Sequence, residues 1–278
     1  MKVGYVILYE DGTLTISKEH TILPKPIHKD YGEFDDKKIP WKNDKKKIKQ
    51  VRILNQIKSN YMNSWFENCY NLTILIDFQN LDVSDCEDFE FIFYGCKSLT
   101  DISSLKNWNV SSGKDFSNMF DSCESLQNLN GLQNWNISNG TNFSFMFEFC
   151  MSLQDLNGLQ NWNVSNGKDF SHMFYQCKLL ISILALSTWD VSNGRDFSFM
   201  FSNCTSLQDI STLTNWNVVN GEDFEGMFHY CVSLKEINLP NTLCKLIANM
   251  FQDCNERLKI HWKTKIYTYE DLLAYKSF

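Results

Sequence analysis

Residues 115–123 read D-F-S-N-M-F-D-S-C, and close copies of this stretch follow one another along the chain. Its apolar side chains are Phe116, Met119, Phe120 and Cys123, at the spacing i, i+3, i+4 and i+7. That spacing places the four side chains on one face of an α-helix. We therefore predict a short amphipathic helix over this stretch and over each of its copies.

The copies recur at a fixed period, which a ladder of cysteines marks. From Cys69 to Cys231 each step is 27 residues, and a last copy ends at Cys254 after a step of only 23. A period of this size is typical of a solenoid, in which each unit buries its apolar face only against its neighbours. The cysteines of the ladder are Cys69, Cys96, Cys123, Cys150, Cys177, Cys204, Cys231 and Cys254.

The second half of each unit is equally regular. After the cysteine comes x-S-L-x-x-[LI], as at Cys123 to Leu129, which predicts a short parallel strand with its leucines directed into the stack. A tryptophan follows, and it suits a hydrophobic seam that offers one hydrogen-bond partner to its N–H. Next, a glycine such as Gly140 is expected to supply a turn conformation that other residues resist, and Asn142 to begin the helix. The sequence thus predicts an α/β repeat solenoid with short parallel strands and short helices.

The two ends of the chain differ from the repeats. Residues 3–18, with Asp11-Gly12 between two apolar runs, predict a β-hairpin, and residues 48–54 predict a further strand. Residues 267–275 predict a short closing helix. Because terminal repeats are usually atypical and shield the stack, we expect a β-rich cap over residues 1–58, the solenoid over 59–254 and a second cap over 255–278.

Charge is distributed unevenly along the chain, whose net charge is −7. Residues 1–60 hold 13 Lys/Arg and 8 Asp/Glu, a net of +5, whereas the remainder holds 13 and 25, a net of −12. An acidic solenoid argues against a nucleic-acid-binding groove along it, because such grooves are basic. A partner protein with a basic surface is the better expectation.

Eight of the ten cysteines end the repeated apolar face, where they are interpreted as small buried apolar side chains. Neighbouring units in register lie about 5 Å apart, so disulfides within the ladder stay open as an alternative. We favour a reduced ladder. Cys86 and Cys244 lie outside it and are predicted to be the more reactive thiols.

The N-terminal residues M-K-V-G-Y-V-I-L-Y-E lack a long apolar run with a small-residue cleavage site, so they do not resemble a signal peptide. No run approaches about 18 apolar residues, so no transmembrane helix is expected. These features predict a cytoplasmic monomer without membrane insertion.

The repeat C-x-S-L-x-x-L…W-[ND]-V-S-N-x-x-[DN]-F-S-x-M-F-x-x-C resembles the BspA-like leucine-rich repeats. The N-terminal hairpin, Pro40-Trp41 and residues 65–69 resemble that family's lead-in, so the resemblance covers roughly residues 3–260. It implies a right-handed leucine-rich-repeat stack and membership of a group with many surface adhesins that bind proteins. Two features depart from the family pattern: Gly113 and its copies stand where an aliphatic residue is common, and Phe116 and its copies where methionine is common.

No motif of catalysis or cofactor binding is found. The sequence contains no C-x-x-C, G-x-S-x-G or phosphate-binding glycine loop. None of the five histidines forms a metal-spaced pair, and His172 and His229 are expected on exposed helix positions two repeats apart. We therefore predict no enzyme activity, no cofactor and no metal.

Two surfaces are candidates for binding a partner. The first is the strand face, where amides and carboxylates form a ladder that one apolar rung interrupts, which resembles an interface core within a polar rim; ordinary solvated strand polarity is the alternative. The predicted partner-binding residues of this face are Asp101, Asn128, Asp155, Ile181, Leu184, Asp209 and Glu236.

The second candidate is the outer face of the predicted helices, where aromatic side chains fall off the buried stripe and can mark an interface. Packing between adjacent helices is the favoured explanation of these residues. The members of this aromatic surface are Phe91, Tyr94, Phe145, Phe149, Tyr175, Phe199 and Tyr230.

Taken together, the sequence predicts a non-enzymatic protein-interaction module that binds a basic partner through its acidic and polar face. Two alternatives stay open. One is an intracellular inhibitor, for example of a phage-borne anti-defence or anti-CRISPR type, that occludes a nucleic-acid-binding enzyme. The other is a surface adhesin of the BspA-like type.

Overall fold

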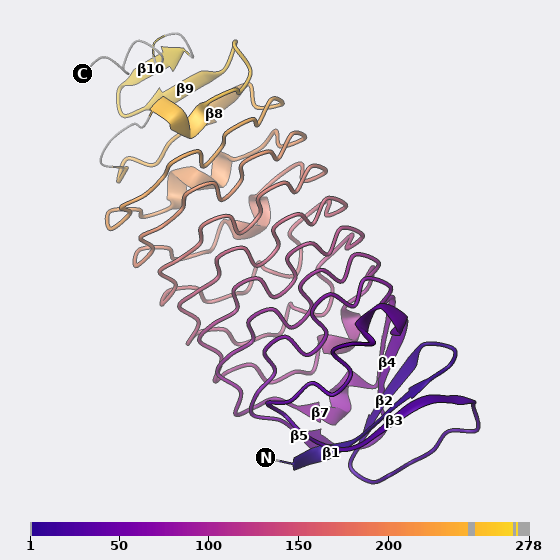
Figure 1. Ribbon diagram of the computed structural model, residues 1–278. Helices are drawn as coiled ribbons and strands as arrows, with labels where there is room; N and C mark the ends of the chain where they lie inside the picture. The colour runs from indigo at the N-terminus through magenta and orange to yellow at the C-terminus, as the bar shows by residue number, and fades with distance from the viewer. Residues whose placement is uncertain (1, 244–247, 269–270, 272–278) are drawn as a thin grey trace.

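The chain is an elongated stack of rungs with a small sheet at each end (Figure 1). The structure, a computed structural model, describes residues 2–243, 248–268 and 271. One continuous core of buried side chains runs through it from Val3 to Ile260. The repeat architecture expected from the period is therefore confirmed, while the right-handed winding and the division into two caps and a solenoid stay predictions.

The N-terminal end is a five-stranded sheet in the order β3-β1-β2-β4-β6, in which β3 is Ile27–Asp35 and β6 is Ile74–Ile76. The strands β1 (Lys2–Tyr9) and β2 (Thr13–Ser17) form the predicted antiparallel hairpin, with Gly12 at a φ of 89° in the connection. Strand β2 then pairs in parallel with β4 (Gln50–Ile53), and β4 pairs with β6 of the first repeat. The sheet thus passes from the hairpin into the stack without a break.

Apart from β3, the remaining elements have five residues or fewer. The strands are β3 (Ile27–Asp35), β5 (Ile57–Lys58), β6 (Ile74–Ile76), β7 (Leu81–Asp82), β8 (Glu236–Asn238), β9 (Lys259–Trp262) and β10 (Lys265–Thr268). The 3₁₀ helices are η1 (Lys45–Lys47), η2 (Phe78–Asn80), η3 (Ser103–Leu105), η4 (Leu184–Leu186), η5 (Ser211–Asn215) and η6 (Ala248–Phe251).

The helix predicted in each repeat is wrong: residues 59–243, all of them described, contain no α-helix. The stretch from Phe116 to Cys123 instead makes successive tight turns. The backbone N–H groups of Phe116 and Phe120 donate hydrogen bonds to Asn142 O and Met146 O of the next rung, both at 2.9 Å. We call this stretch and its copies the turn side of the stack.

Residues with a left-handed backbone conformation explain why the turn side is not helical. Asn118 and Ser122 have φ values of 56° and 58°, which interrupt a right-handed helix and aim alternate N–H groups at the neighbouring rung. The four apolar side chains of this stretch are nonetheless fully buried, as the i, i+3, i+4, i+7 spacing predicted. Two consecutive turns and two helical turns bury the same positions, so the pattern could not distinguish them.

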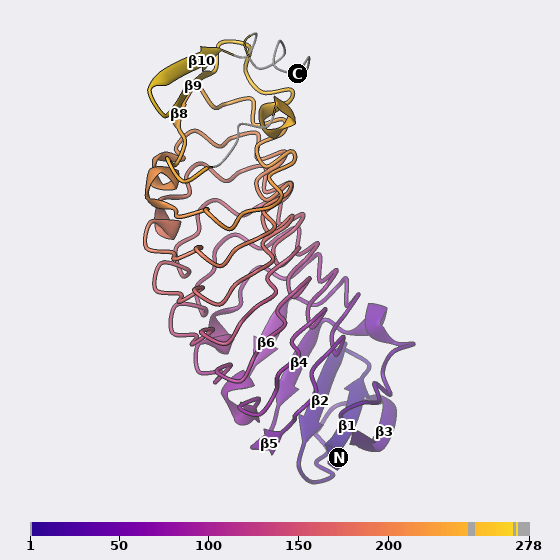
Figure 2. The ribbon, with the colours of Figure 1, turned by 90° about the vertical axis from the view of Figure 1, so that its left-hand side faces the viewer.

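Among the described residues, the strand predicted after each cysteine is formed only near the two ends of the stack, as β6 after Cys69, β8 after Cys231 and β9 after Cys254. In most rungs the segment bends, because a side-chain oxygen accepts the N–H two residues ahead; Asp155 Oδ1 accepts from Asn157 N at 2.8 Å. Such Asx turns compete with extended structure. We call this segment, Ser125 to Leu132 and its copies, the strand side; Figure 2 shows its 3₁₀ segments along one edge and the turns along the opposite edge.

The conformation of the strand side varies from rung to rung. Gly131 and Gly158 have φ values of 113° and 111° and form open turns. Ala185, which stands 27 residues after Gly158, lies instead within the 3₁₀ helix η4. A left-handed turn suits glycine, whereas the 3₁₀ conformation accepts a side chain. The local sequence therefore selects the backbone of each rung on this side.

The tryptophan seam is confirmed. Trp135 Nε1 donates to Leu105 O at 3.0 Å, and its ring lies 6.4 Å from that of Trp162, with the rings nearly parallel. The equivalent tryptophans, Trp108, Trp162, Trp189 and Trp216, each donate to a backbone carbonyl 30 residues earlier.

The turn glycines serve a different purpose from the one predicted. Gly140 does not adopt a positive φ; it is required because a Cβ atom there would lie 2.4 Å from Cζ of Phe143. Gly113 and Phe116 show the same contact. The two departures from the family pattern are thus coupled, since a glycine makes room for the phenylalanine ring three residues ahead.

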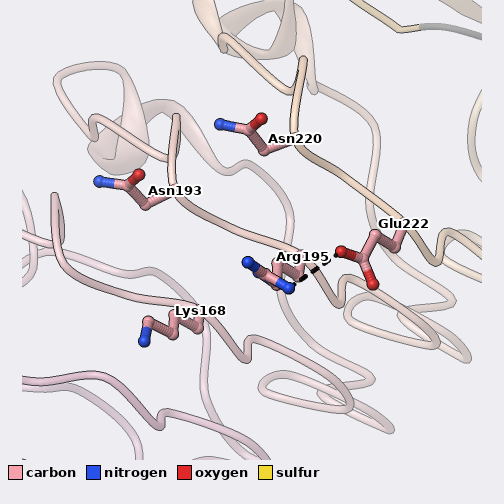
Figure 3. A pocket seen from close by; sticks show the side chains of 5 residues that line it. All are labelled: Lys168, Asn193, Arg195, Asn220 and Glu222. Carbon is pink, nitrogen blue, oxygen red and sulfur yellow. Dashed lines mark hydrogen bonds and ion pairs between the residues drawn. The ribbon is translucent and has the colours of Figure 1, made fainter.

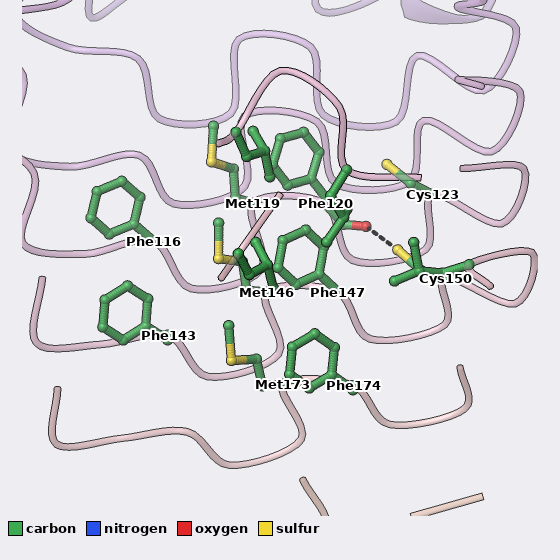
Figure 4. Close-up of a cluster of buried hydrophobic side chains, with 14 of the residues drawn as sticks. Phe116, Met119, Phe120, Cys123, Phe143, Met146, Phe147, Cys150, Met173 and Phe174 are labelled. Carbon is green, nitrogen blue, oxygen red and sulfur yellow. Dashed lines mark hydrogen bonds between the residues drawn. The ribbon is translucent and has the colours of Figure 1, made fainter. Parts of the chain in front are cut away.

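The cysteine ladder is buried and its thiols are free. Cys150 Sγ donates to Phe120 O of the preceding rung at 3.3 Å, beside the stacked phenylalanines (Figure 4). Burial also raises the pKa of the Cys86 thiol to about 12, so the prediction that Cys86 is reactive is wrong. Cys244 lies outside the described residues.

The C-terminal end closes with the sheet β10-β9-β8. The closing helix predicted over residues 267–275 is wrong at its first two residues, because Tyr267 and Thr268 belong to β10. Asp271 is helical, and Asp271 N and Thr268 N bond reciprocally to the side chains of Thr268 and Asp271, as in a capping box. The other predicted residues of this helix lie outside the described part of the chain.

Candidate protein-interaction surfaces

The predicted polar ladder lies on the strand side, with one member on each rung except the rung of Ile181 and Leu184. Asp101 and Asp209 are exposed, and Asn128 and Asp155 are half-buried at the equivalent place. Glu236 is exposed in β8, at the last rung of the series. Equivalent residues of successive repeats stand at the same place on stacked rungs, so these side chains form one column along the stack.

The carboxylates of this column also shape their own turns. Asp101 Oδ1 accepts from Ser103 N at 2.8 Å, and Asp209 Oδ1 accepts from Ser211 N at 3.0 Å. The backbone hydrogen bond from Ser211 is the largest cause that lowers the pKa of Asp209. This carboxylate therefore stays ionised at neutral pH while one of its oxygens holds the turn. These hydrogen bonds fix the Asp101 and Asp209 carboxylates in position on the column.

The apolar residues that interrupt this polar column are exposed to solvent. Ile181 is 53% exposed and Leu184 59% exposed. The structure adds Leu179, which is 47% exposed and which the sequence analysis did not select. The sequence could have identified Leu179, because the equivalent residues 152 and 206 are serines. We call these three side chains the aliphatic rung.

The backbone of the aliphatic rung is firmly held. Ser182 and Asp209 form a parallel β-bridge, and Ser182 Oγ accepts from Leu184 N at 3.1 Å. Gln208 N donates to Ile181 O at 2.9 Å, and Ile183 N to Asp209 O at 3.2 Å. Exposed aliphatic side chains on an ordered backbone lose little conformational entropy on binding, which favours an interface.

The aromatic surface lies on the turn side, and several of its members occupy left-handed positions. Phe145, Phe149 and Phe199 are half-buried with φ values between 53° and 59°. The rings of Phe145 and Phe199 pack on either side of His172, at centroid distances of 4.6 and 5.0 Å. Packing between rungs therefore accounts for these rings, as favoured from the sequence, although no helices are involved. Tyr230, which is 47% exposed, is the most exposed member of the aromatic surface.

His172 and His229 are half-buried rather than exposed, which corrects their expected placement. Burial lowers the pKa of His172, and its Nδ1 is buried without a hydrogen-bond partner. His229 instead lies 3.2 Å from Asp253 through Nε2. Within the described residues, no three or more His, Cys, Asp or Glu side chains are grouped to hold a metal ion.

Sequence reasoning missed a pair of carboxyl groups on the turn side. Asp121 and Glu148 stand on adjacent rungs and share a hydrogen bond between their side chains. Burial raises the pKa of Asp121 to about 6, and burial followed by the charge of Asp121 raises the pKa of Glu148 to about 8. At neutral pH the pair retains a proton. No local motif marks it, because the two residues are 27 positions apart.

A shallow hollow of about 200 Å³ lies between the turns of three rungs (Figure 3). Its charged members are Lys168, Arg195 and Glu222, and Arg195 pairs with Glu222 at 3.2 Å. Asn193 and Asn220 donate to backbone carbonyls of the preceding rungs, each at 2.8 Å. Most of its polar groups are thus used to hold the rungs together.

No described helix is both long and apolar enough to span a bilayer. That finding concerns only the part of the chain that the structure describes.

Comparison with known proteins gives one family. The model of the family described as "Mycoplasma protein of unknown function, DUF285" matches residues 58–181 and 153–263. No curated protein matches the chain. The family description names no catalytic activity.

Several solved structures are similar to this chain, and their titles name leucine-rich-repeat proteins, the class that the repeat motif resembles. The protein from T. pallidum is 16% identical, with a TM-score of 0.38 over 84% of this chain and 81% of that one. A protein from Eubacterium ventriosum is 15% identical, with a TM-score of 0.36 over 90% and 92%. A leucine rich cell surface protein from Faecalibacterium prausnitzii is 18% identical, with a TM-score of 0.30 over 92% and 86%.

Proposed function

The chain belongs to the DUF285 family, and we propose that it is a non-enzymatic protein-interaction module that binds a partner with a basic surface through its strand side. The observation that carries the proposal is the aliphatic rung. Its three side chains are exposed, and the equivalent residues of the two neighbouring rungs are polar. Asp155 lies on the preceding rung and Asp209 on the following rung.

The aliphatic rung and the carboxylates have different expected roles. Apolar side chains near the centre of an interface usually contribute most of the binding free energy, whereas charges at the rim mainly affect the association rate and its salt dependence. Ile181 and Leu184 are therefore expected to anchor the partner. Asp155 and Asp209 are expected to attract its basic groups, most strongly at low salt.

The test is capture of partners from native lysate with the wild-type chain and with Ile181→Asp and Leu184→Asp variants, followed by quantitative mass spectrometry. Val219→Asp is the matched control, because Val219 is also 53% exposed but lies elsewhere. We expect a basic protein that the wild type and the control retain and that both rung variants lose by at least about tenfold. Equal retention by all four baits would refute the proposed site.

The aromatic surface is the competing site, and its most exposed member gives the cleanest comparison. Tyr230→Ser leaves the stacked rings of Phe145, His172 and Phe199 in place. Loss of the captured partner with Tyr230→Ser, together with normal binding by the rung variants, would move the site to the turn side.

The cytoplasmic location predicted from the sequence forms part of this proposal. Fractionation of the source cells with an antibody against the chain tests it, and recovery at the cell surface would favour the adhesin alternative. The inhibitor alternative predicts that the captured partner is a nucleic-acid-binding enzyme whose activity falls when the chain is added.

A further inference from the structure

The N-terminal end carries a basic hollow on a chain that is otherwise acidic. The segment between β3 and β4, at the indigo end of Figure 1, lines two adjoining cavities of about 610 and 670 Å³. The two cavities share Lys42, Lys45 and Glu67. Lys37, Lys38 and Lys46 contribute further ammonium groups, and together these residues form what we call the basic hollow.

The segment that carries these lysines is held in one conformation. Trp41 is fully buried and donates from Nε1 to Trp65 O at 2.8 Å. Tyr31 Oη donates to Asp44 Oδ2 at 2.8 Å, which ties the segment to β3. The basic hollow is therefore formed before any ligand arrives.

The carboxylates around the basic hollow are already engaged. Glu67 accepts from Lys45 Nζ at 3.1 Å through one oxygen and from Asn68 Nδ2 at 3.1 Å through the other. Asp44 pairs with Lys47 at 2.7 Å and with Lys29 at 3.5 Å.

Among the described residues, four ammonium groups remain without an ion pair, although the pKa of Asp35 is lowered first by the backbone hydrogen bond from Lys37 and also by the charge of Lys38. In the described part of the chain, Lys37, Lys38, Lys42 and Lys46 form no ion pair, although all four side chains are exposed. Like charges gathered in a hollow raise the local positive potential and attract anions. The hollow also has apolar walls, because Ile39 and Pro40 are half-buried there and Lys46 Nζ lies 6.0 Å from the ring of Tyr70.

We propose that the basic hollow binds a short acidic segment of a partner protein, with its carboxylates facing the four lysines and an apolar side chain against Ile39 and Pro40. A short segment fits better than a long polyanion. Residues beyond 60 have a net charge of −12, so a nucleic acid that extended past the hollow would meet a repulsive surface. This site differs from the strand side in position and in the sign of its charge, so the two proposals stand or fall separately.

The test uses the full chain and a fluorescein-labelled peptide of glutamates interrupted by leucines, with binding followed by fluorescence anisotropy. Lys38→Glu with Lys42→Glu reverses two charges in the basic hollow. Lys18→Glu with Lys49→Glu is the matched control, because both lysines are exposed in the same part of the chain and lie outside the hollow. Thermal melts establish that both variants fold.

We expect the hollow variant to bind the peptide at least about tenfold more weakly than the wild type, and the control to stay within about threefold. Binding should weaken between about 0.02 and 0.15 M salt. Equal losses in the two variants would mean that only net charge matters and would overturn the proposal, as would no binding by the wild type at low salt.

Two further measurements exclude other occupants. A single-stranded oligonucleotide of the same net charge should bind more weakly than the peptide; tighter binding would replace the acidic segment with a nucleic acid. Sedimentation at low salt should show a monomer. Self-association that the hollow variant abolishes would mean that a second copy of this chain occupies the hollow, and would also overturn the proposal.

Discussion

The turn side and the strand side of the same rungs differ in how strictly each repeat copies the last. On the turn side, Phe120, Phe147 and Phe174 stack at 5.6 Å, and N–H groups bond from rung to rung at equivalent places. On the strand side, some rungs form open glycine turns and others form 3₁₀ helices, and Ile181 is exposed where other rungs carry glutamine, threonine or lysine. A continuous ladder on one side stabilises the stack, which leaves the other side free to vary from rung to rung.

The largest loss of stability is expected from a substitution on the turn side. Phe147→Ala should lower the free energy of unfolding by about 3–5 kcal/mol, because Phe147 is fully buried between two other rings. Urea denaturation measures it. The strand-side control Gln154→Ala, at an exposed position, should change stability by less than about 0.5 kcal/mol. Similar losses in the two variants would contradict the division of the rung into two sides.

Gly140→Ala should cost about 1–3 kcal/mol, because the added Cβ meets the Phe143 ring at 2.4 Å. Phe143→Met in the same chain should recover part of this loss, since a flexible methionine can move away from the added methyl group. A double-mutant cycle by urea denaturation measures the coupling. Additive losses would show that the glycine is needed for another reason.

The change in stability with pH is expected to be smaller than the losses from these two substitutions, because Glu148 is only partly buried and solvent screens its charge. The pKa values of Asp121 and Glu148 are raised from 3.8 to about 6 and from 4.5 to about 8. Over that window the folded chain holds protons that the unfolded chain has released. The free energy of unfolding should therefore fall as pH rises from about 4 to about 8 and then level off.

Urea midpoints measured below, within and above this window test the pair. Glu148→Gln should flatten the slope, whereas Glu225→Gln, at an exposed position on the turn side, should leave it unchanged. A slope that survives Glu148→Gln would assign the pH dependence to other groups.

The smallest effect is expected on the strand side from Gly158→Ala. The left-handed φ of Gly158 and the approach of Leu129 O disfavour a side chain in the observed turn, but Ala185 shows that the equivalent segment can form a 3₁₀ helix instead. We expect a loss of about 1 kcal/mol or less in urea denaturation. A loss as large as that of Gly140→Ala would show that the strand side cannot adapt.

Several features followed from local sequence. The hairpin around Gly12 and the strand β4 lie where turn and β-propensity signals placed them. The tryptophans make the single edge hydrogen bond that their chemistry favours. The exposure of Ile181 and Leu184 could also be anticipated, because they stand at polar positions of a known period. Such features depend on residues near one another in sequence or related by the repeat.

The sequence by itself determined the repeat period, the identity of the buried side chains and the place of the aliphatic rung, because each depends on periodic burial. Only the tertiary structure decided that the turn side is a ladder of left-handed turns, that Gly140 makes room for Phe143, and that Asp121 and Glu148 share a hydrogen bond with raised pKa values. The basic hollow also needed the fold, which brings Glu67 beside Lys45. The rung-to-rung ladder and the carboxyl pair arise between residues about 27 positions apart, whereas the contact of Gly140 with Phe143 depends on how the backbone turns within one rung.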